Sequence, residues 1–318
     1  MKETNIDTEK EKKVVICITT YNRNEDVLEC LDSVYSSNFK NFNVIVFDNH
    51  SDEKINKNQL MKYSNLQYIY NDKNIGITGG KNFCEKMAKG KYIMFLDDDT
   101  IIDENTIGEL VKTMDKDPKI GISAPKMFFY DNGKTNIFIA GLGQFSKLTT
   151  LCSDIVYHQK DIGQFEYQAS IDYAQNGYMV RKTVSETVGG YDSKIFMTYH
   201  ETEYFIKVQK LGYKTLYIPT AKLWHKLSLT SQKSNLLRDV LGLPYPQRIY
   251  YNMRNRSVIV KRYYSWYAKT IYIFFLVHLF SLYYFYKFIA YRASRDYFKY
   301  LFKGYFDGLL IFLGIKKL

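Results

Sequence analysis

The chain has 318 residues, 46% hydrophobic and 24% charged, which suits a globular protein with one large core and a smaller second unit. Its charged N-terminus lacks an apolar run and its four cysteines lack metal-ligand spacing, so we expect no secretory signal and buried thiols in a reducing, cytoplasmic compartment. The net charge of +11 lies entirely from Leu241 onward, where there are 13 Lys or Arg and 2 Asp or Glu; this basic, aromatic tail indicates an anionic partner surface, either membrane or nucleic acid.

The first half of the chain alternates between strand and helix patterns. Short apolar runs predict buried strands over 14–18, 43–47, 66–70 and 92–96, and apolar residues at helical spacing predict helices over 27–35, 83–89 and 107–114. The segment NDKNIGITGGKN is expected to be a loop, and Asp103 to cap the third helix. This alternation predicts a doubly wound α/β sheet with mainly parallel strands. Ligands bind such sheets at the carboxyl ends of the strands, where Asp48 and Asp97 to Asp99 lie.

The second half of the chain is less regular. Between 121 and 191 the strand-like pieces FIA, DYA and YMV are short, and a helix pattern over 201–211 follows, which Gly212 is expected to end. A strand is predicted over 214–219, with AKLWHK after it. Residues 228–246 are polar with two late prolines and indicate a mobile loop leading to the tail.

Three adjacent carboxylates, Asp97, Asp98 and Asp99, follow a strongly apolar strand. Carboxylates this close repel one another unless a cation neutralises them, and alternate strand residues face the same side, so the first and third can share a ligand. Oxygen ligands of this kind suit Mg²⁺ or Mn²⁺, which commonly bridge a protein carboxylate to a diphosphate. A solvated turn is the alternative, but the position after a buried strand favours a metal site.

The order of the motifs resembles a known family. The chain resembles the inverting GT-A glycosyltransferases of family 2, in particular bacterial rhamnosyltransferase-like members, through TTYNR, FDNHSDE, NIGITGGKN, FLDDD, DYAQNGYMVRK, GGYDSKIFMTY, HETEYFIKVQKLGY, PTAKLWH and the RNR run. The resemblance covers Val14 to about Ser231. It implies a GT-A fold, which is a Rossmann-like, mainly parallel twisted sheet flanked by helices. The expected divisions are a polar lead (1–13), a catalytic domain (14–240) with a nucleotide-sugar-binding half (14–120) and an acceptor-binding half (121–240), and a helical tail (241–318).

The resemblance also implies a role for each matched residue. The donor would be bound by Thr20, Tyr21 and Arg23, by Asp48 on the pyrimidine base, by Lys73, Asn74 and Gly76 along the nucleotide and diphosphate, and by Asp97 and Asp98. Asp99 would hold the metal ion, Mn²⁺ or Mg²⁺, with Asp97 as a secondary ligand and His225 as a late histidine ligand. A lone His is more often structural, and an Asp after a strand can be a simple turn residue, but the ordered series favours the ligand roles.

Inverting transfer needs one base, which removes the proton of the acceptor hydroxyl as its oxygen attacks the anomeric carbon. The metal meanwhile stabilises charge on the leaving nucleoside diphosphate. Family members usually carry Glu-Asp ahead of the KLGY segment, whereas this chain has His200 and Glu201 there. We predict Glu201 as the base, with His200 and Glu203 as secondary candidates. The alternative is that acidic residues in a first helical turn complement the helix dipole.

The tail contains an uncharged run of 17 residues, Thr270 to Tyr286. As a helix it would span about 25 Å, short of the roughly 30 Å apolar layer of a bilayer, and both flanks are basic. A polar face formed by Arg295, Lys299, Lys303 and Asp307 is typical of an interfacial amphipathic helix. We therefore predict peripheral attachment to the anionic inner face of the cell membrane. Burial between two chains of a homo-oligomer is the alternative, and nucleic-acid binding is disfavoured by the long uncharged stretches.

Together these features predict a metal-dependent inverting glycosyltransferase. It would move a sugar, rhamnose by resemblance, from a dTDP- or UDP-sugar to a hydroxyl of a lipid-linked glycan in surface polysaccharide or cell-wall biosynthesis. Two other classes stay open at this point. A nucleotidyltransferase also uses paired aspartates, a metal and an α/β sheet, and a membrane-bound scaffold could keep a degenerate site.

Overall fold

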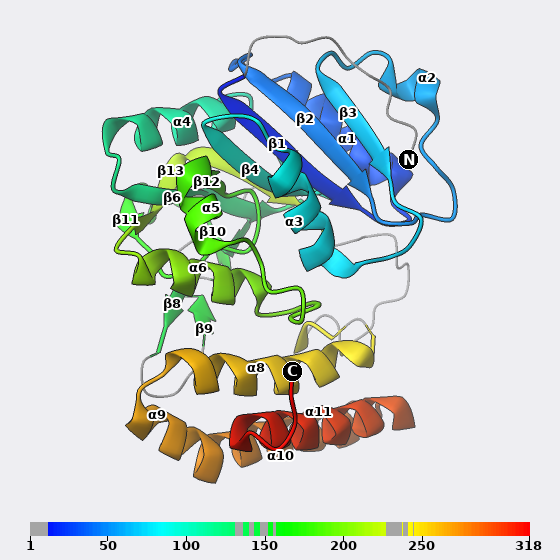
Figure 1. Cartoon of the computed structure of the whole chain (residues 1–318), viewed down its shortest axis with the longest axis vertical. Coiled ribbons are helices and arrows are strands. Elements are labelled where there is room, and N and C mark those ends of the chain that lie inside the picture. Colours follow the sequence, from blue (N-terminus) through cyan, green and yellow to red (C-terminus); the bar gives the residue numbers. More distant parts are fainter. Residues whose placement is uncertain are drawn as a thin grey trace.

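A computed structural model describes residues 12–130, 136–139, 143–146, 152–154, 157–226, 237, 241–243 and 245–318. An α/β unit stands on a layer of C-terminal helices (Figure 1). The loop predicted over 228–246 lies mostly outside the described residues.

The first half of the chain forms the parallel part of the main sheet. Strand β1 (Val14–Thr20) pairs in parallel with β2 (Phe42–Asp48) and with β4 (Tyr92–Asp97), and β2 pairs in parallel with β3 (Leu66–Tyr70). The connecting helices are α1 (Asn24–Tyr35), α2 (Lys57–Leu60) and α3 (Gly76–Met87). The predicted parallel sheet is confirmed, and it places the carboxyl ends of β1, β2 and β4 along one edge (Figure 1).

The second half of the chain extends this sheet with strands of mixed direction. Strand β12 (Met179–Arg181) lies antiparallel between β4 and β6 (Ile120–Phe129). Strand β13 (Lys214–His225) runs parallel to β6 and antiparallel to β5 (Thr100–Ile102). The shorter strands are β7 (Asn136–Ile139), β8 (Gly143–Phe145), β9 (Cys152–Asp154), β10 (Tyr157–Lys160) and β11 (Ala169–Ser170). AKLWH therefore belongs to one long strand, whose end returns to the edge where β4 ends.

Both faces of the sheet are covered by helices, because alternate strand residues supply two separate apolar cores. One core joins β1 residues such as Ile16 to α1 and to α4 (Thr106–Lys116). The other joins Cys17 and its neighbours to α3 and α6 (His200–Lys210), and α5 (Lys182–Val188) closes the same face. This two-layer covering accounts for the nearly uninterrupted apolar strands in the sequence.

Two local expectations were wrong. The glycines of NIGITGGKN lie inside α3 and not in a loop, because they allow the helix to approach the sheet; a Cβ at Gly80 would lie 2.9 Å from the Cγ2 of Thr19. Asn105 and not Asp103 precedes α4, although the Asp103 carboxylate accepts a hydrogen bond from the Asn105 N–H at 3.0 Å.

The C-terminal helices pack into a layer below the sheet (Figure 1). They are α8 (Gln247–Tyr263), α9 (Trp266–Ile271), α10 (Val277–Ala290) and α11 (Arg295–Leu313), and a π-helical turn over Tyr272–Leu276 makes one helix of Trp266–Ala290. That helix has 25 residues and is long and apolar enough to cross a membrane by length and composition. The helix is longer than the 17-residue uncharged run because its backbone continues past Lys269 and Lys287. Its length alone therefore does not distinguish a membrane-spanning helix from a surface helix.

Candidate active site

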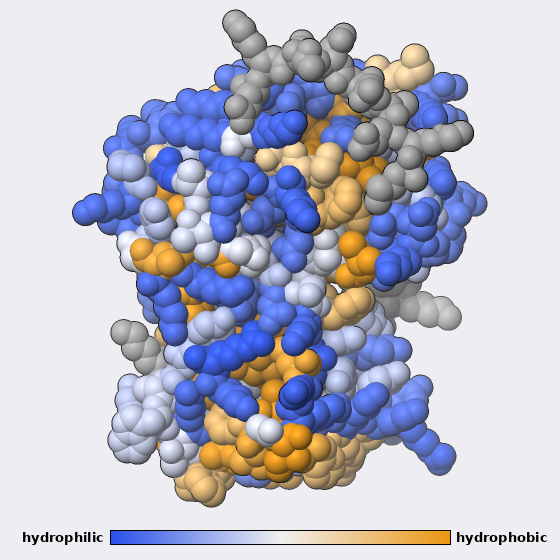
Figure 2. Space-filling view, in the orientation of Figure 1, coloured by the Kyte–Doolittle hydropathy of each residue, from blue (hydrophilic) through white to orange (hydrophobic). Residues whose placement is uncertain are grey.

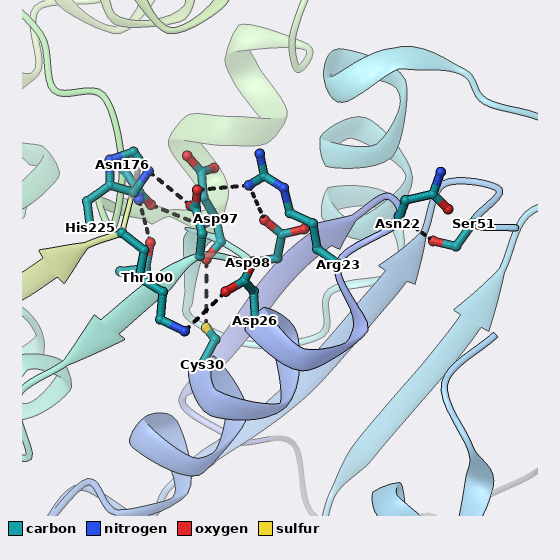
Figure 3. Close-up of polar contacts among 12 residues, drawn as sticks. Asn22, Arg23, Asp26, Cys30, Ser51, Asp97, Asp98, Thr100, Asn176 and His225 are labelled. Atoms are coloured by element: carbon teal, nitrogen blue, oxygen red, sulfur yellow. Dashed lines mark hydrogen bonds and ion pairs between the residues drawn. The ribbon is translucent and has the colours of Figure 1, made fainter. Parts of the chain in front are cut away.

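The end of β4 and the end of β13 meet at one acidic cluster (Figure 3). Ligand atoms of Asp97, Asp99 and His225 all lie within 4.8 Å of one another. The β5–β13 pairing sets Thr100 opposite His225, and this register brings the imidazole from a distant part of the sequence to the aspartates. The cluster unites the three residues that the sequence analysis proposed around a metal ion.

Arg23 contacts both Asp98 and Asp99, whose pKa values are shifted in opposite directions. Its Nη1 lies 2.8 Å from the Oδ2 of Asp99 and 3.1 Å from the Oδ1 of Asp98. Burial opposes ionisation of Asp99, but His225, at 3.0 Å, and Arg23 outweigh it and hold the pKa of Asp99 below its ordinary value. Burial instead raises the pKa of Asp98, and Arg23 offsets this only in part. Asp99 is therefore the better anionic ligand.

The donor set fits a divalent cation. Two carboxylates and one imidazole are ligands that Mn²⁺ accepts readily, and Mg²⁺ would use the carboxylates. Burial disfavours the protonated form of His225, yet Asp99 raises its pKa. A cation bound to this cluster would therefore displace the proton of the His225 imidazolium and would itself neutralise the Asp97 and Asp99 carboxylates.

A buried lysine that the sequence analysis did not assign connects the cluster to the predicted base. Lys81, on α3, is 2% exposed, and its Nζ lies 3.2 Å from the Oε1 of Glu201 and 3.8 Å from the Oδ1 of Asp97. His200 contributes a second contact, with its Nε2 2.5 Å from the same Glu201 oxygen. Burial opposes ionisation of Glu201, but His200 and Lys81 outweigh it and lower its pKa to about 2. The position of Lys81 within NIGITGGKN was the available signal.

Asn176 is a second residue that was missed. Its Oδ1 accepts a hydrogen bond from the Asp97 N–H at 3.0 Å, and its Nδ2 donates to the Oγ1 of Thr100 at 2.6 Å (Figure 3). It thereby fixes both ends of the turn that carries the aspartates. It lies in DYAQNGY, which was read as a matched segment without a role.

The residues predicted to bind the donor differ in exposure. Thr20 is buried, whereas Tyr21 and Lys73 are exposed. Asn74 accepts hydrogen bonds from the Asn49 side chain at 3.0 Å and from the Gly76 N–H at 2.9 Å, which orders the start of α3. Gly76 has φ +75°, and a Cβ there would lie 2.4 Å from the Phe196 ring, so this position requires glycine.

Asp48 is turned into the protein. It is 0% exposed, and its carboxylate accepts hydrogen bonds from the Ser51 N–H at 2.8 Å and from the Tyr68 hydroxyl at 2.5 Å. In this conformation the carboxylate shapes the loop after β2 and does not face a ligand. Contact with a pyrimidine base stays a prediction and would require this loop to rearrange.

Glu203 is not part of the cluster. Its oxygens contact the Tyr263 hydroxyl at 2.5 Å and the Lys207 Nζ at 3.0 Å, so it joins α6 to α8. Residues two apart on a helix point about 200° apart, and Glu203 therefore faces away when Glu201 faces Lys81. This geometry gives Glu203 a structural contact and does not favour its secondary role as a base, which stays a prediction, whereas His200 lies beside Glu201.

The sequence matches a known family over half of its length. Residues 15–174 match the profile described as "Glycosyl transferase family 2". The chain belongs to this family. The match covers β1, the aspartate triplet and the segment that leads to Asn176, and ends before Glu201 and His225.

Relatives with assigned names extend the similarity. The chain is 27% identical over 254 residues to the "dTDP-rhamnosyl transferase RfbF" of Shigella flexneri. The alignment covers 77% of this chain and 79% of that protein. The chain is 26% identical over 137 residues to "Glycosyltransferase GlyG" of Streptococcus pneumoniae and 32% identical over 111 residues to a glycosyltransferase of Rickettsia bellii. These two alignments cover 44% and 16% of the relatives, so the chain spans less than half of either.

Solved structures agree with the fold. The chain resembles the structure of GalNAc-T7, which was solved with UDP, GalNAc and Mn²⁺, with a TM-score of 0.56 at 16% identity; the superposition covers 78% of this chain and 51% of that one. The S. aureus TarS fragment 1–349 gives a TM-score of 0.55 at 15% identity, over 91% and 81%. The expected glycosyltransferase fold is thereby confirmed, with its C-terminal apolar helix.

Proposed function

We propose that this family 2 member is a metal-dependent inverting glycosyltransferase that uses a nucleotide-sugar donor. The observation that carries the proposal is the cluster of Asp97, Asp99 and His225 within 4.8 Å of one another, with Glu201 joined to Asp97 through Lys81. A nucleotidyltransferase needs no such carboxylate at the head of a late helix. A scaffold would have no need to keep a lysine buried between two carboxylates.

Each residue of the cluster then has a chemical role. Asp99 and His225 would hold the cation, with Asp97 beside them, and a bound cation would stabilise negative charge on the leaving nucleoside diphosphate. Glu201 accepts the proton of the acceptor hydroxyl while that oxygen forms a bond to the anomeric carbon. The bond from the anomeric carbon to the diphosphate oxygen breaks in the same step, and the configuration at the anomeric carbon inverts. Lys81 keeps Glu201 ionised before the acceptor arrives.

The proposed donor is a dTDP- or UDP-sugar. RfbF, which aligns over most of both chains, is named for a dTDP-rhamnosyl donor, and GalNAc-T7 and TarS have been solved with UDP. The RfbF alignment favours rhamnose. The proposed donor-binding residues are Thr20, Tyr21, Arg23, Lys73, Asn74, Gly76, Asp97 and Asp98, with Asp48 acting through its loop.

The proposed acceptor is a hydroxyl of a lipid-linked glycan at the cytoplasmic face of the membrane. GgaB of Bacillus subtilis, named for minor teichoic acid biosynthesis, is 24% identical over 241 residues, which covers 70% of this chain and 26% of that protein. In the C-terminal layer, large apolar side chains such as Phe274, Leu282 and Tyr286 are exposed, and Figure 2 shows this hydrophobic surface at the bottom of the molecule. An apolar surface within a basic segment suits an anionic membrane.

A donor screen tests the proposal. Wild-type protein is heated with UDP, dTDP, UDP-N-acetylglucosamine, UDP-galactose and dTDP-rhamnose, with and without Mn²⁺, and the donor that raises the melting temperature is assayed for release of its nucleoside diphosphate. We expect Mn²⁺-dependent release that Asp99→Ala and Glu201→Gln abolish, while Glu201→Gln still binds the donor. Wild-type protein that binds and hydrolyses none of these donors contradicts the proposal. Release of pyrophosphate from a nucleoside triphosphate and a sugar phosphate would support the nucleotidyltransferase instead.

A further inference from the structure

Helix α6, which carries Glu201, begins from a strained turn. Thr198 has φ 55° and Tyr199 has φ 62°, so two consecutive residues other than glycine adopt the left-handed conformation immediately before His200. This conformation is unfavourable for Thr in particular, because its side chain is branched at Cβ. The Glu203 N–H then bonds to the Tyr199 carbonyl at 2.9 Å and closes the first turn of the helix. The direction of Glu201 therefore depends on the backbone of this turn.

A strained turn persists only where its surroundings hold it, and here the holding residues come from α8. Asn255 is fully buried, and its Nδ2 donates to the Met197 carbonyl at 2.7 Å and to the Thr198 carbonyl at 3.1 Å. Its Oδ1 accepts two hydrogen bonds from Arg254, whose Nη2 also donates to the Lys194 carbonyl at 2.8 Å. The amide of Asn255 is thus fixed from both sides.

Arg256 acts on the next residue of the turn. Its Nε donates to the Tyr199 hydroxyl at 2.7 Å, and its guanidinium carbon lies 4.0 Å from the centre of the Phe280 ring on α10. It also lies 5.7 Å from the Tyr199 ring. A guanidinium placed among rings in this way gains cation–π attraction as well as a hydrogen bond. One side chain therefore links the turn before Glu201 to the apolar C-terminal layer.

We propose that Asn255 and Arg256 are positioning residues for the base: they hold Thr198 and Tyr199 in the left-handed conformation and so direct Glu201 toward Lys81. This inference rests on the proposed function of Glu201 and gives a role to the RNR run, residues 254–256. Asn255 and Arg256 lie 54 and 55 positions after the base, yet they contact the three residues that precede helix α6, Met197, Thr198 and Tyr199.

The test compares Arg256→Gln and Tyr199→Phe with Arg248→Gln, which removes the same charge from the first turn of α8. With Mn²⁺ and dTDP-rhamnose, or whichever donor the screen selects, Arg256→Gln is expected to lower kcat for nucleotide release about tenfold or more, with the donor KM changed by less than about twofold. Arg256→Lys is expected to recover part of kcat. Because both single variants delete one hydrogen bond, the double variant should be no slower than Arg256→Gln alone.

Hydrogen exchange gives a readout that needs no turnover. The amides of residues 199–205 are expected to exchange about tenfold faster in Arg256→Gln and Tyr199→Phe than in Arg248→Gln, while the strands β1 and β4 stay as protected as in wild type. Unchanged exchange over 199–205, additive losses of kcat, or equal losses of kcat in Arg248→Gln would overturn the proposal. If wild-type protein turns over no donor, the glycosyltransferase proposal fails, and the exchange comparison still decides whether α8 holds this turn.

Discussion

The Nζ of Lys81 lies 3.2 Å from the Oε1 of Glu201. The lysine is almost completely buried and also lies near Asp97, so a single ammonium group joins the proposed base to the acidic cluster. Because a buried charge is stable only when it is paired, these groups depend on one another, and a change in one should alter the titration of the others.

The pH dependence of turnover tests this pairing. Burial opposes ionisation of Glu201, but His200 and Lys81 lower its pKa to about 2. With Mn²⁺ at a saturating concentration, so that protonation of His225 does not limit metal binding, a base with a lowered pKa is ionised at every pH above it. Turnover should then fall with acid only below about pH 3, well under the ordinary glutamate value of about 4.3. Lys81→Met should move this acid limb upward, and Lys81→Arg should not. A wild-type acid limb above about pH 5, in protein shown to be folded there, contradicts the assignment.

Metal binding should distinguish the adjacent aspartates. Asp99→Asn and His225→Ala remove members of the cluster and should weaken Mn²⁺ binding at least about tenfold. Asp98→Asn is the matched control, because Asp98 contacts Arg23 and is not one of the three clustered residues. Mn²⁺ titration followed by electron paramagnetic resonance measures the affinity without any donor. Equal weakening by Asp98→Asn and Asp99→Asn would be inconsistent with this site.

The close packing of α11 on α8 should make the protein less stable when Gly304 is replaced by a larger residue. A Cβ at Gly304 would lie 2.6 Å from the Tyr250 carbonyl oxygen, so Gly304→Ala must push the two helices apart and should cost about 1–3 kcal/mol. Gly108, in α4, is the control, since its Cβ would meet the Phe39 Cβ at 3.9 Å. Gly108→Ala should stabilise by about 0.5–1 kcal/mol through helix propensity. Urea unfolding measures both, and a neutral Gly304→Ala would mean that the helices are less close than described.

The exposed surface of α10 should bind anionic lipid. Leu282 and Tyr286 are 64% and 68% exposed, and replacing both with Glu should release the protein from phosphatidylglycerol vesicles in co-sedimentation. Ile162 is 78% exposed on the α/β unit, and Ile162→Glu should have no effect. High salt should weaken binding of wild type in part. A double variant that dissociates a dimer and leaves vesicle binding unchanged would favour the oligomer instead.

The sequence predicted those parts of the site that lie beside a strong local pattern. Asp97 and Asp99 follow an apolar strand, and such strands nearly always end at the ligand-binding edge of an α/β sheet. His225 was placed by its resemblance to a late motif, and the long strand β13 brings it to the aspartates.

Residues whose role depends on tertiary contacts could not be predicted in this way. A lysine in a predicted loop is normally exposed, whereas tertiary packing buries Lys81 between Asp97 and Glu201, with the rings of Tyr178 and Tyr191 each 5.8 Å from its Nζ. Asn176 and Arg256 act on backbone or side chains far away in sequence, and no local spacing encodes those partners. The sequence pattern did not settle which side of α6 faces the cluster, so Glu203 could not be separated from Glu201 before the structure placed it against Tyr263 and Lys207.

Helix α8 is shared by two parts of the molecule that composition separates at Leu241. Its Asn255 and Arg256 support the turn before Glu201, and its other side is packed by Gly304 and Gly308 of α11. A shortened protein that ends before α8 would therefore lose the support of its base, and one that ends after α8 would expose the surface that α11 covers. Chimaeras built from two relatives should accordingly stay active only when the segment that carries the base and the C-terminal helices come from the same parent.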